Sequence, residues 1–277
     1  MSSAQWLRLL KNVGTWKGSF TNFSPTAQLI KDTPSELILQ GLNDNESIKI
    51  TVTKFDGNSQ PYSNEFTYLN RSIFLFEEGH FAKGSLQFSP YTIFGAEYGF
   101  LVSDRTASLC DRRCRMVQIY DTSSNLEEVT LIREFRENSN AQERPQLTLE
   151  QLLGEWEGKA ETLYPDWRNS EPYQTNFKIE QQGNQVSQTL TSPELNFSST
   201  GTINDSYISF NDSDKEIRVL LLPDGASATL PLKIENRQPF FLEFAWLVEP
   251  NHRLRLIRQY DDKGAWKNIT LIKEYKK

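Results

Sequence analysis

The sequence has few of the cysteine and histidine residues that form metal sites and nucleophilic active sites. It contains two cysteines and two histidines, whereas a structural zinc site needs four ligands. His80 and His252 lie in different halves of the chain, and we find no serine–histidine–aspartate set and no phosphate-binding glycine loop. We therefore expect no metal and no cofactor. Cys110 and Cys114, within CDRRC, are expected to be reduced thiols near a strand, with a redox disulfide as the alternative.

Long apolar runs and an excess of positive charge are also missing. No run approaches the ~20 residues of a membrane helix, so we expect no membrane span. The net charge is −6 and each half is negative, which argues against nucleic acid or an anionic membrane surface as a partner. The N-terminus lacks the apolar core of a signal peptide, and we expect a cytoplasmic protein. The sequence identifies no protein partner.

What the sequence does contain is an internal repeat. LLKNVGTWKGSF at 9–20 and QLLGEWEGKAET at 151–162 share G-x-W-x-G, 140 residues apart. The same offset relates RMVQIYD to RLIRQYD and TLIREFRE to TLIKEYKK near the ends of the halves. FGAEYGFLV at 94–102 also parallels FFLEFAWLV at 240–248, at an offset of 146. Matching offsets at both ends of a module indicate a tandem duplication.

The repeat also places the domain boundary. The segment ENSNAQERPQ is polar, aperiodic and contains a proline, as a linker should. We predict an N-terminal domain at 1–138, a linker at 139–146 and a C-terminal domain at 147–277. A chain of 277 residues with 12% aromatics has enough apolar material for two cores of ordinary size.

Each half is predicted to be a short helix followed by strands. WLRLLKNV and LTLEQLL have helical leucine spacing, and Thr148 is a plausible N-cap. The remainder alternates apolar and polar residues between turn signals, which predicts roughly ten short strands per half. Many short antiparallel strands hide their edges by closing into a barrel or stacking two sheets. We predict an all-β protein of two tandem antiparallel β-barrels, each preceded by a short helix.

A short helix leading into G-x-W on the first strand resembles the calycin superfamily of lipocalins and fatty-acid-binding proteins. The duplicated whole resembles a family of lipocalin-like proteins found mainly in cyanobacteria, whose function is not established. The resemblance implies that Trp16 and Trp156 have a structural role, closing one end of each barrel against an arginine. Arg115 and Arg255 are the preferred partners, and Arg133 with Lys273 is the other pair, although a lysine departs from the pattern.

One apolar strand face in the second half is a candidate ligand wall. Alternation puts four large apolar side chains on the same face, where they line a cavity or fill a core: Phe240, Leu242, Phe244 and Trp246. On the following strand, Arg258 and Tyr260 resemble the carboxylate-binding pair of fatty-acid-binding proteins, because both donate hydrogen bonds to anions. The alternative is a surface ion pair. The first half has Gln118 in place of Arg258.

Glu97 and Glu243 occupy matching places within apolar strands. A tight turn after the strand would set Glu243 opposite Arg258 or Gln259, as a cross-strand pair. If Glu243 faces the barrel instead, it becomes a candidate acid or base. The candidate catalytic residues are then Glu243, Arg258 and Tyr260.

These observations support two functional hypotheses. The first is binding of a hydrophobic small molecule, such as a pigment, isoprenoid, fatty acid or polyketide-like compound, in a barrel cavity. The C-terminal barrel is preferred, since it alone has the arginine at 258. The alternative is an enzyme without metal or cofactor: a cyclase, an isomerase or a bilin-lyase-like protein with its active site in the barrel. Because one fold supports many functions, the sequence does not decide between them.

Overall fold

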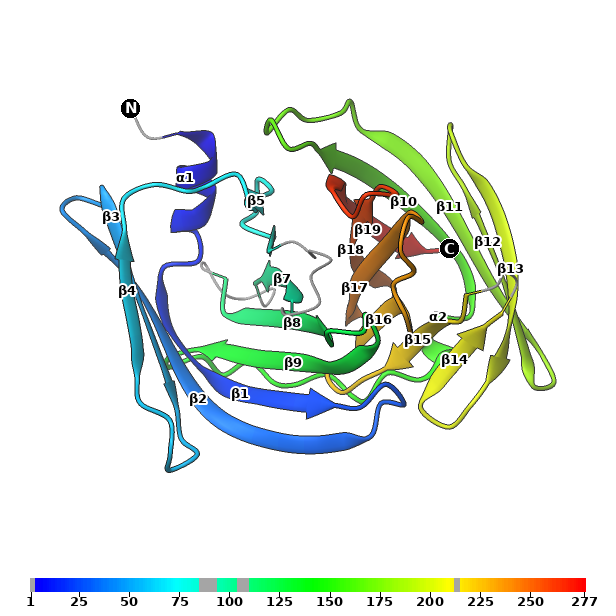
Figure 1. Cartoon of the computed structure of the whole chain (residues 1–277), viewed down its shortest axis with the longest axis horizontal. Helices are drawn as coiled ribbons and strands as arrows, with labels where there is room; N and C mark the ends of the chain where they lie inside the picture. The colour runs from blue at the N-terminus through cyan, green and yellow to red at the C-terminus, as the bar shows by residue number, and fades with distance from the viewer. Residues whose placement is uncertain (1–2, 85–93, 104–109, 212–214) are drawn as a thin grey trace.

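The computed structural model describes residues 3–84, 94–103, 110–211 and 215–277. Across them the protein is almost entirely β-structure, arranged as two strongly curved sheets that lie side by side (Figure 1). The predicted all-β fold class with two β-rich domains is confirmed. The two domains differ, however, in how completely their sheets close.

The N-terminal domain is a nine-stranded antiparallel sheet in the order β4-β3-β2-β1-β9-β8-β7-β6-β5. Its end strands β4 and β5 are not paired with each other, so this sheet is an open half-barrel rather than the closed barrel that we predicted. Strands β5 and β6 have only three residues each, too few to carry the ladder around to β4. The elements are α1 (Ala4–Leu10), β1 (Gly14–Phe23), β2 (Leu29–Leu42), β3 (Ser47–Lys54), β4 (Tyr62–Phe66), β5 (Ile73–Leu75), β6 (Phe81–Lys83), β7 (Phe94–Val102), β8 (Arg112–Tyr120) and β9 (Leu126–Arg136).

The C-terminal domain is a closed ten-stranded barrel in which each strand pairs with the next. Closure is made by the ladder between β10 and β19, in which Trp156 lies opposite Lys276. The elements are α2 (Leu149–Leu152), β10 (Gly154–Leu163), β11 (Tyr173–Gln182), β12 (Gln185–Thr191), β13 (Asn196–Ile203), β14 (Tyr207–Phe210), β15 (Ile217–Leu221), β16 (Ala226–Pro231), β17 (Phe240–Glu249), β18 (His252–Tyr260) and β19 (Trp266–Lys276).

The G-x-W-x-G motif has the same role in both domains. Trp16 and Trp156 are buried, and each indole N–H donates 2.9 Å to a carbonyl at the end of the preceding helical segment, that of Asn12 or Leu152. The bond ties the short helix to the first strand and satisfies the buried indole. At Gly18 a Cβ would lie 1.8 Å from the carbonyl oxygen of Arg133, so the second glycine of the motif permits close approach of β1 and β9.

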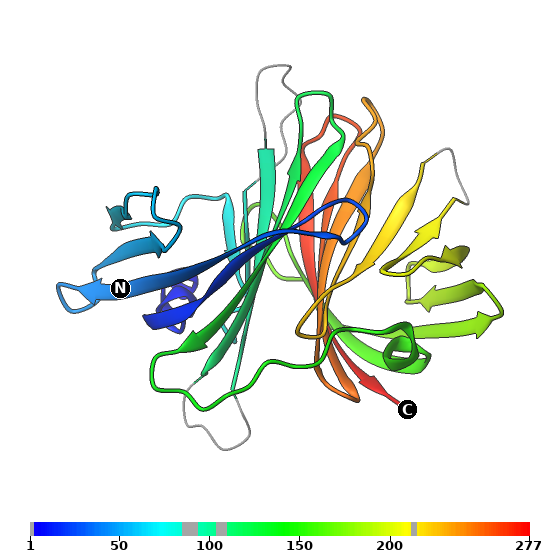
Figure 2. The same cartoon turned by 90° about the horizontal axis from the view of Figure 1, so that it is seen from below.

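The two sheets pack against each other through equivalent strands. Phe100 on β7 contacts Phe244 on β17 with ring centroids 4.8 Å apart, and Phe74 stacks on Trp266 at 3.7 Å. One cluster of buried apolar residues draws on both domains. Figure 2 shows the green strands of the first domain beside the orange and red strands of the second. The domains thus share a core, in addition to the interior of each sheet.

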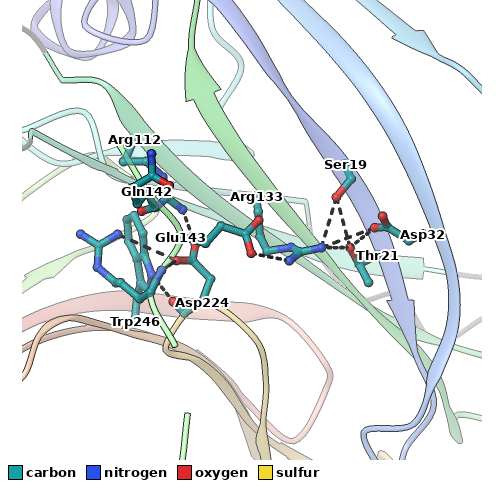
Figure 3. Close-up of polar contacts among 10 residues, drawn as sticks. Ser19, Thr21, Asp32, Arg112, Arg133, Gln142, Glu143, Asp224 and Trp246 are labelled. Carbon is teal, nitrogen blue, oxygen red and sulfur yellow. Dashed lines mark hydrogen bonds and ion pairs between the residues drawn. The ribbon is translucent and has the colours of Figure 1, made fainter. Parts of the chain in front are cut away.

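The linker between the domains, with Glu143 and Arg144, forms hydrogen bonds and ion pairs with both domains. The Arg144 backbone N–H donates to Asp224 (2.6 Å), and its guanidinium donates to the carbonyl of Val248 (2.6 Å). Asp224 also binds the guanidinium of Arg112, so this buried carboxylate joins the linker to both sheets. Glu143 pairs with Arg133 on β9 at 2.8 Å. Figure 3 shows the contact of Asp224 with Arg112 and that of Glu143 with Arg133.

Candidate functional site

The C-terminal barrel encloses a pocket of about 250 Å³. A second pocket of about 300 Å³ adjoins it and shares five of its lining residues. The wall of the first pocket is largely apolar and combines α2 with strands from around the barrel: Leu149, Leu152, Phe177, Ile179, Val186, Leu190, Leu195, Phe197, Ile208, Phe210, Val219, Phe241 and Ile257. A closed, mostly apolar pocket with a few polar groups is typical of small-molecule sites.

Four charged side chains form the polar part of this domain's interior. Two guanidinium nitrogens of Arg255 donate hydrogen bonds of 3.0 and 2.8 Å to the carboxylate of Glu243, and the third donates to Glu274 at 2.9 Å. Arg253 donates to the other oxygen of Glu274 at 2.8 and 2.6 Å. All four are at most 5% exposed, and Glu243, Arg253 and Arg255 line the pocket. We call this set the C-terminal charged floor.

Two members of the C-terminal charged floor, Glu274 and Arg255, are held in their charged forms by their neighbours. Burial on its own would raise the pKa of Glu274, but the charges and hydrogen bonds of Arg253 and Arg255 outweigh it and hold that pKa below its usual value. Burial would likewise lower the pKa of Arg255, yet the two carboxylates raise it. Since both oxygens of Glu243 accept bonds from Arg255, the arrangement is a structural ion-pair network.

The N-terminal domain repeats this network. Arg115 bonds to Glu97 at 2.7 Å and to Glu134 at 2.7 and 3.0 Å, and Arg113 bonds to Glu134 at 2.6 Å. Lys83 adds an ion pair to Glu97 at 2.6 Å. Burial would raise the pKa of Glu97, but Lys83 and Arg115 lower it to about 2. We call these five residues the N-terminal charged floor.

This second floor borders a cleft of about 680 Å³ on the concave side of the half-barrel. Apolar side chains from five strands, the 67–70 segment and the end of α1 line it: Leu9, Leu37, Leu39, Ile50, Phe66, Leu69, Ile73, Leu75 and Phe81. Strand β4 and residues 67–70 supply an exposed rim. The protein therefore has two concave sites, one within the closed barrel and one within the open half-barrel.

Sequence reasoning singled out two residues of each network and missed Lys83, Arg113, Glu134, Arg253 and Glu274. A signal for them exists. The R-x-R spacing of Arg113–Arg115 recurs at Arg253–Arg255, and a glutamate recurs in the final strand of both halves. Residues two apart share one strand face, so charges repeated within otherwise apolar strands indicate a common buried network.

The structure places the predicted apolar wall on the outer face of β17. Phe240, Leu242, Phe244 and Trp246 all belong to the core between the domains. The barrel interior is instead lined by the alternate residues, among them Phe241 and Glu243. Phe240 also borders the second pocket, at the end of its strand.

Arg258 and Tyr260 lie on that same outer face of the sheet. Arg258 is 1% exposed, with the rings of Phe74, Tyr260 and Trp266 between 5.2 and 5.8 Å from its guanidinium carbon. Glu243 is on the inner face. The three candidate catalytic residues are therefore not brought together in one site.

The expected strand register at Glu243 was wrong. Glu243 lies opposite Ile257, with a bulge between Leu247 and Glu249 that shifts the ladder. Its ion-pair partner is the diagonal neighbour Arg255, at 2.8 Å, rather than Arg258 or Gln259.

The positively charged groups that lie over the rings of Trp16 and Trp156 do not belong to Arg115 and Arg255, the partners preferred from the sequence. The guanidinium carbons of Arg113 and Arg136 lie 4.6 and 4.4 Å from the Trp16 ring centre. Over Trp156 the corresponding groups are Arg253 at 4.8 Å and Lys276 at 5.4 Å. Arg115 and Arg255 are instead the centres of the two ion-pair networks. Of the other pair considered, Arg133 binds Glu143 and Lys273 binds Glu78.

The histidines and cysteines occupy separate sites. Burial lowers the pKa of His80 to about 4, and its Nδ1 accepts a bond from the Leu101 N–H at 3.1 Å. Cys110 and Cys114 are unpaired thiols. No group of three or more histidine, cysteine and acidic side chains suited to a metal occurs within the described residues. The same part of the chain contains no helix of the length and apolarity needed to cross a membrane.

Comparison with solved structures gives a strong match that covers the whole chain. A crystal structure of a protein of unknown function from the DUF3598 family of Nostoc punctiforme PCC 73102 has a TM-score of 0.91 and 40% identity, with 100% of both chains covered. The S-type phycobiliprotein lyase CPES from Guillardia theta gives a TM-score of 0.37 and 12% identity, over 46% of this chain and 89% of that one.

Two family models match consecutive parts of the sequence. The N-terminal domain of unknown function DUF3598 matches residues 2–139. The C-terminal domain of biogenesis factor required for ATP synthase 1 matches residues 143–277. No curated protein matches the chain. The full-length similarity to the Nostoc structure shows that this chain belongs to the DUF3598 family.

Proposed function

We propose that the C-terminal barrel binds one hydrophobic small molecule. The observation that carries this proposal is the pocket of about 250 Å³ inside the closed barrel, with its largely apolar wall. An apolar molecule of matching shape gains free energy there because it leaves water without displacing a packed side chain. The adjoining pocket of about 300 Å³ offers room for an elongated molecule, with Phe240 and Phe241 at its border.

The charged floor narrows the class of ligand. The charges of two arginines and two glutamates cancel. Each guanidinium nitrogen of Arg255 already donates a hydrogen bond to Glu243 or Glu274. An additional carboxylate would leave a net negative charge in a buried site, which is costly. We therefore favour a neutral molecule, such as an isoprenoid or polyketide-like compound with a hydroxyl or carbonyl, over a free fatty acid.

The proposal is tested with Nile red, a neutral lipophilic dye, by fluorescence titration. Leu190 is half-buried on β12 and lines the pocket, so Leu190→Trp should fill the space and weaken binding at least tenfold. Ile50, half-buried on β3, lines the N-terminal cleft, and Ile50→Trp is the matched control. We expect its affinity for Nile red to equal that of the wild type.

Two results would overturn this proposal. One is a wild-type protein that neither binds Nile red nor carries a lipophilic molecule in native mass spectrometry. The other is equal binding by the wild type and Leu190→Trp. Far-ultraviolet circular dichroism of each variant shows whether the barrel remains folded.

We propose binding and no chemical step. The enzymatic alternative depended on Glu243 acting with Arg258 and Tyr260. Glu243 faces the pocket, while the other two belong to the opposite side of the sheet, which packs on the N-terminal domain. No observation favours a cyclase, isomerase or lyase over a binding protein.

A further inference from the structure

The two charged floors differ in charge. In the C-terminal domain, Arg253 and Arg255 face Glu243 and Glu274. In the N-terminal domain, Arg113 and Arg115 face Glu97 and Glu134 in the same places, and Lys83 is added. The N-terminal floor therefore carries one positive charge more than its carboxylates can balance.

The position of the extra cation is defined by strand register. Lys83 lies opposite Glu97 in the ladder between β6 and β7. In the second domain the residue opposite Glu243 is Thr229, on β16. Lys83 and Thr229 both line their respective concave sites. The difference in charge between the two floors thus comes from one structurally equivalent position.

The same floor also contains an unused buried donor. Arg113 is 2% exposed, and its Nε donates to Glu134, but its Nη2 is buried with no hydrogen-bond partner in the described part of the chain. The equivalent Arg253 donates both Nε and Nη2 to Glu274. A buried guanidinium nitrogen without a partner is costly, and Arg113 lines the cleft. An anionic oxygen in the cleft would supply the missing acceptor.

The remainder of the cleft suits an apolar chain. Its wall is mostly aliphatic and aromatic, and its volume of about 680 Å³ exceeds that of either pocket in the barrel. Glu65 is the other carboxylate in the lining. It is exposed on the edge strand β4 and accepts a bond of 2.7 Å from Ser47, so water screens its charge from the floor.

We propose that the N-terminal cleft is a second binding site, specific for a single-chain amphiphile with an anionic head. Arg113 and Lys83 receive the anion, and the apolar wall receives the chain. This site differs from the one proposed in the C-terminal barrel both in place and in the charge of its ligand.

The test compares dodecanoate and dodecyl phosphate with neutral dodecanol, each below its aggregation concentration, by isothermal titration calorimetry on the full chain. The wild type should bind both anions at least tenfold more tightly than dodecanol. Lys83→Met should reduce the affinity for the anions at least tenfold and leave dodecanol unchanged. Because Lys83 is half-exposed, this variant keeps the buried part of the network. The two anions distinguish a carboxylate site from a phosphate site.

Blocking variants locate the site. Ile50→Trp should abolish dodecanoate binding and Leu190→Trp should preserve it, the reverse of the pattern expected with Nile red. A gain of function completes the design, because Thr229→Lys places the extra cation in the C-terminal barrel and should add a second dodecanoate site there.

Three outcomes would overturn this second proposal. They are equal dodecanoate affinity in the wild type and Lys83→Met, loss of dodecanoate binding in Leu190→Trp but not in Ile50→Trp, and no binding of either anion to the wild type. Each leaves the Nile red result on the C-terminal barrel unaffected, so the two proposals fail separately.

Discussion

The half-barrel and the closed barrel share a charged floor and differ in the strands around it. The four charged residues that the floors share lie on β7–β9 in one domain and on β17–β19 in the other, and the opposite faces of these strands pack the domains together. The divergent strands are the ones farther along the sheet, where three-residue β5 and β6 replace the longer β15 and β16. A duplicated sheet can therefore keep a buried ion-pair network and still change from a closed barrel to an open half-barrel.

The largest expected effect is the removal of the central carboxylate of a floor. Glu274→Gln leaves two buried guanidinium groups with one charged partner between them, which should cost about 3–5 kcal/mol in the free energy of unfolding. Glu134→Gln should cost at least as much, because Arg113 and Arg115 are as buried as their counterparts and Lys83 adds a further cation to this floor. Urea denaturation of both variants measures the difference.

The matched control for this pair is Glu155→Gln. Glu155 and its partner Lys277 are each about half exposed, so the change should be within about 0.5 kcal/mol. If Glu134→Gln proves less costly than Glu274→Gln, the extra cation Lys83 does not explain how the two floors differ.

The next effect concerns pH and the buried histidine of the N-terminal domain. His80 has its pKa lowered by burial from 6.5 to about 4. Between these values the unfolded chain takes up a proton and the folded chain does not, so acid favours unfolding. The free energy of unfolding should fall by about 3 kcal/mol as pH drops from 7 to 4.

His80→Asn tests this assignment, because an amide oxygen can replace Nδ1 as acceptor for the Leu101 N–H. The variant should lose most of the pH dependence between 6.5 and 4.5, above the range in which the buried carboxylates titrate. His252→Asn should change the slope less, since His252 is only partly buried. An unchanged slope in His80→Asn would refute the prediction.

A smaller effect is expected at the two tryptophans. Trp16→Phe and Trp156→Phe each lose one indole hydrogen bond of 2.9 Å to the preceding helical segment and leave a buried carbonyl without it. Each should cost about 1–2 kcal/mol in thermal or urea unfolding. If both variants lose the same free energy of unfolding, the motif contributes equally to the stability of the open and the closed sheet. A difference above about 1 kcal/mol between them would contradict that equivalence.

The smallest effect is expected at the ion pair between Glu78 and Lys273, which joins the domains at a partly exposed point. Lys273→Met should change the free energy of unfolding by less than about 1 kcal/mol. A larger loss, or separate unfolding transitions for the two domains, would mean that this pair matters more to their association than the aromatic core beside it.

The sequence was sufficient to predict the duplication and the two β-rich domains, because the G-x-W motif and the terminal strands recur at fixed distances. It could not predict that the first sheet stays open. Closure depends on whether the end strands meet, and the alternation within a strand carries no information about that. The three-residue strands at 73–75 and 81–83 have no distinctive pattern of their own.

The orientation of the strand at 240–249 could not be deduced for a different reason. Both of its faces are buried, one inside the barrel and one against the other domain. The most apolar face, with Phe244 and Trp246, proved to be the dry face between domains, while the pocket face carries Glu243. The more apolar face of this strand forms the contact between the two domains and does not line the ligand pocket.

The contact between the domains has a further consequence. Tyr98 and Phe244 hold the same place in the repeat, as do Phe100 and Trp246, and the members of each pair touch one another across the interface. Contact between equivalent residues of two repeated units is expected when a two-fold axis relates the units. The molecule is thus built as a dimer whose subunits are joined by a peptide tether, so that pairing of its halves does not weaken on dilution.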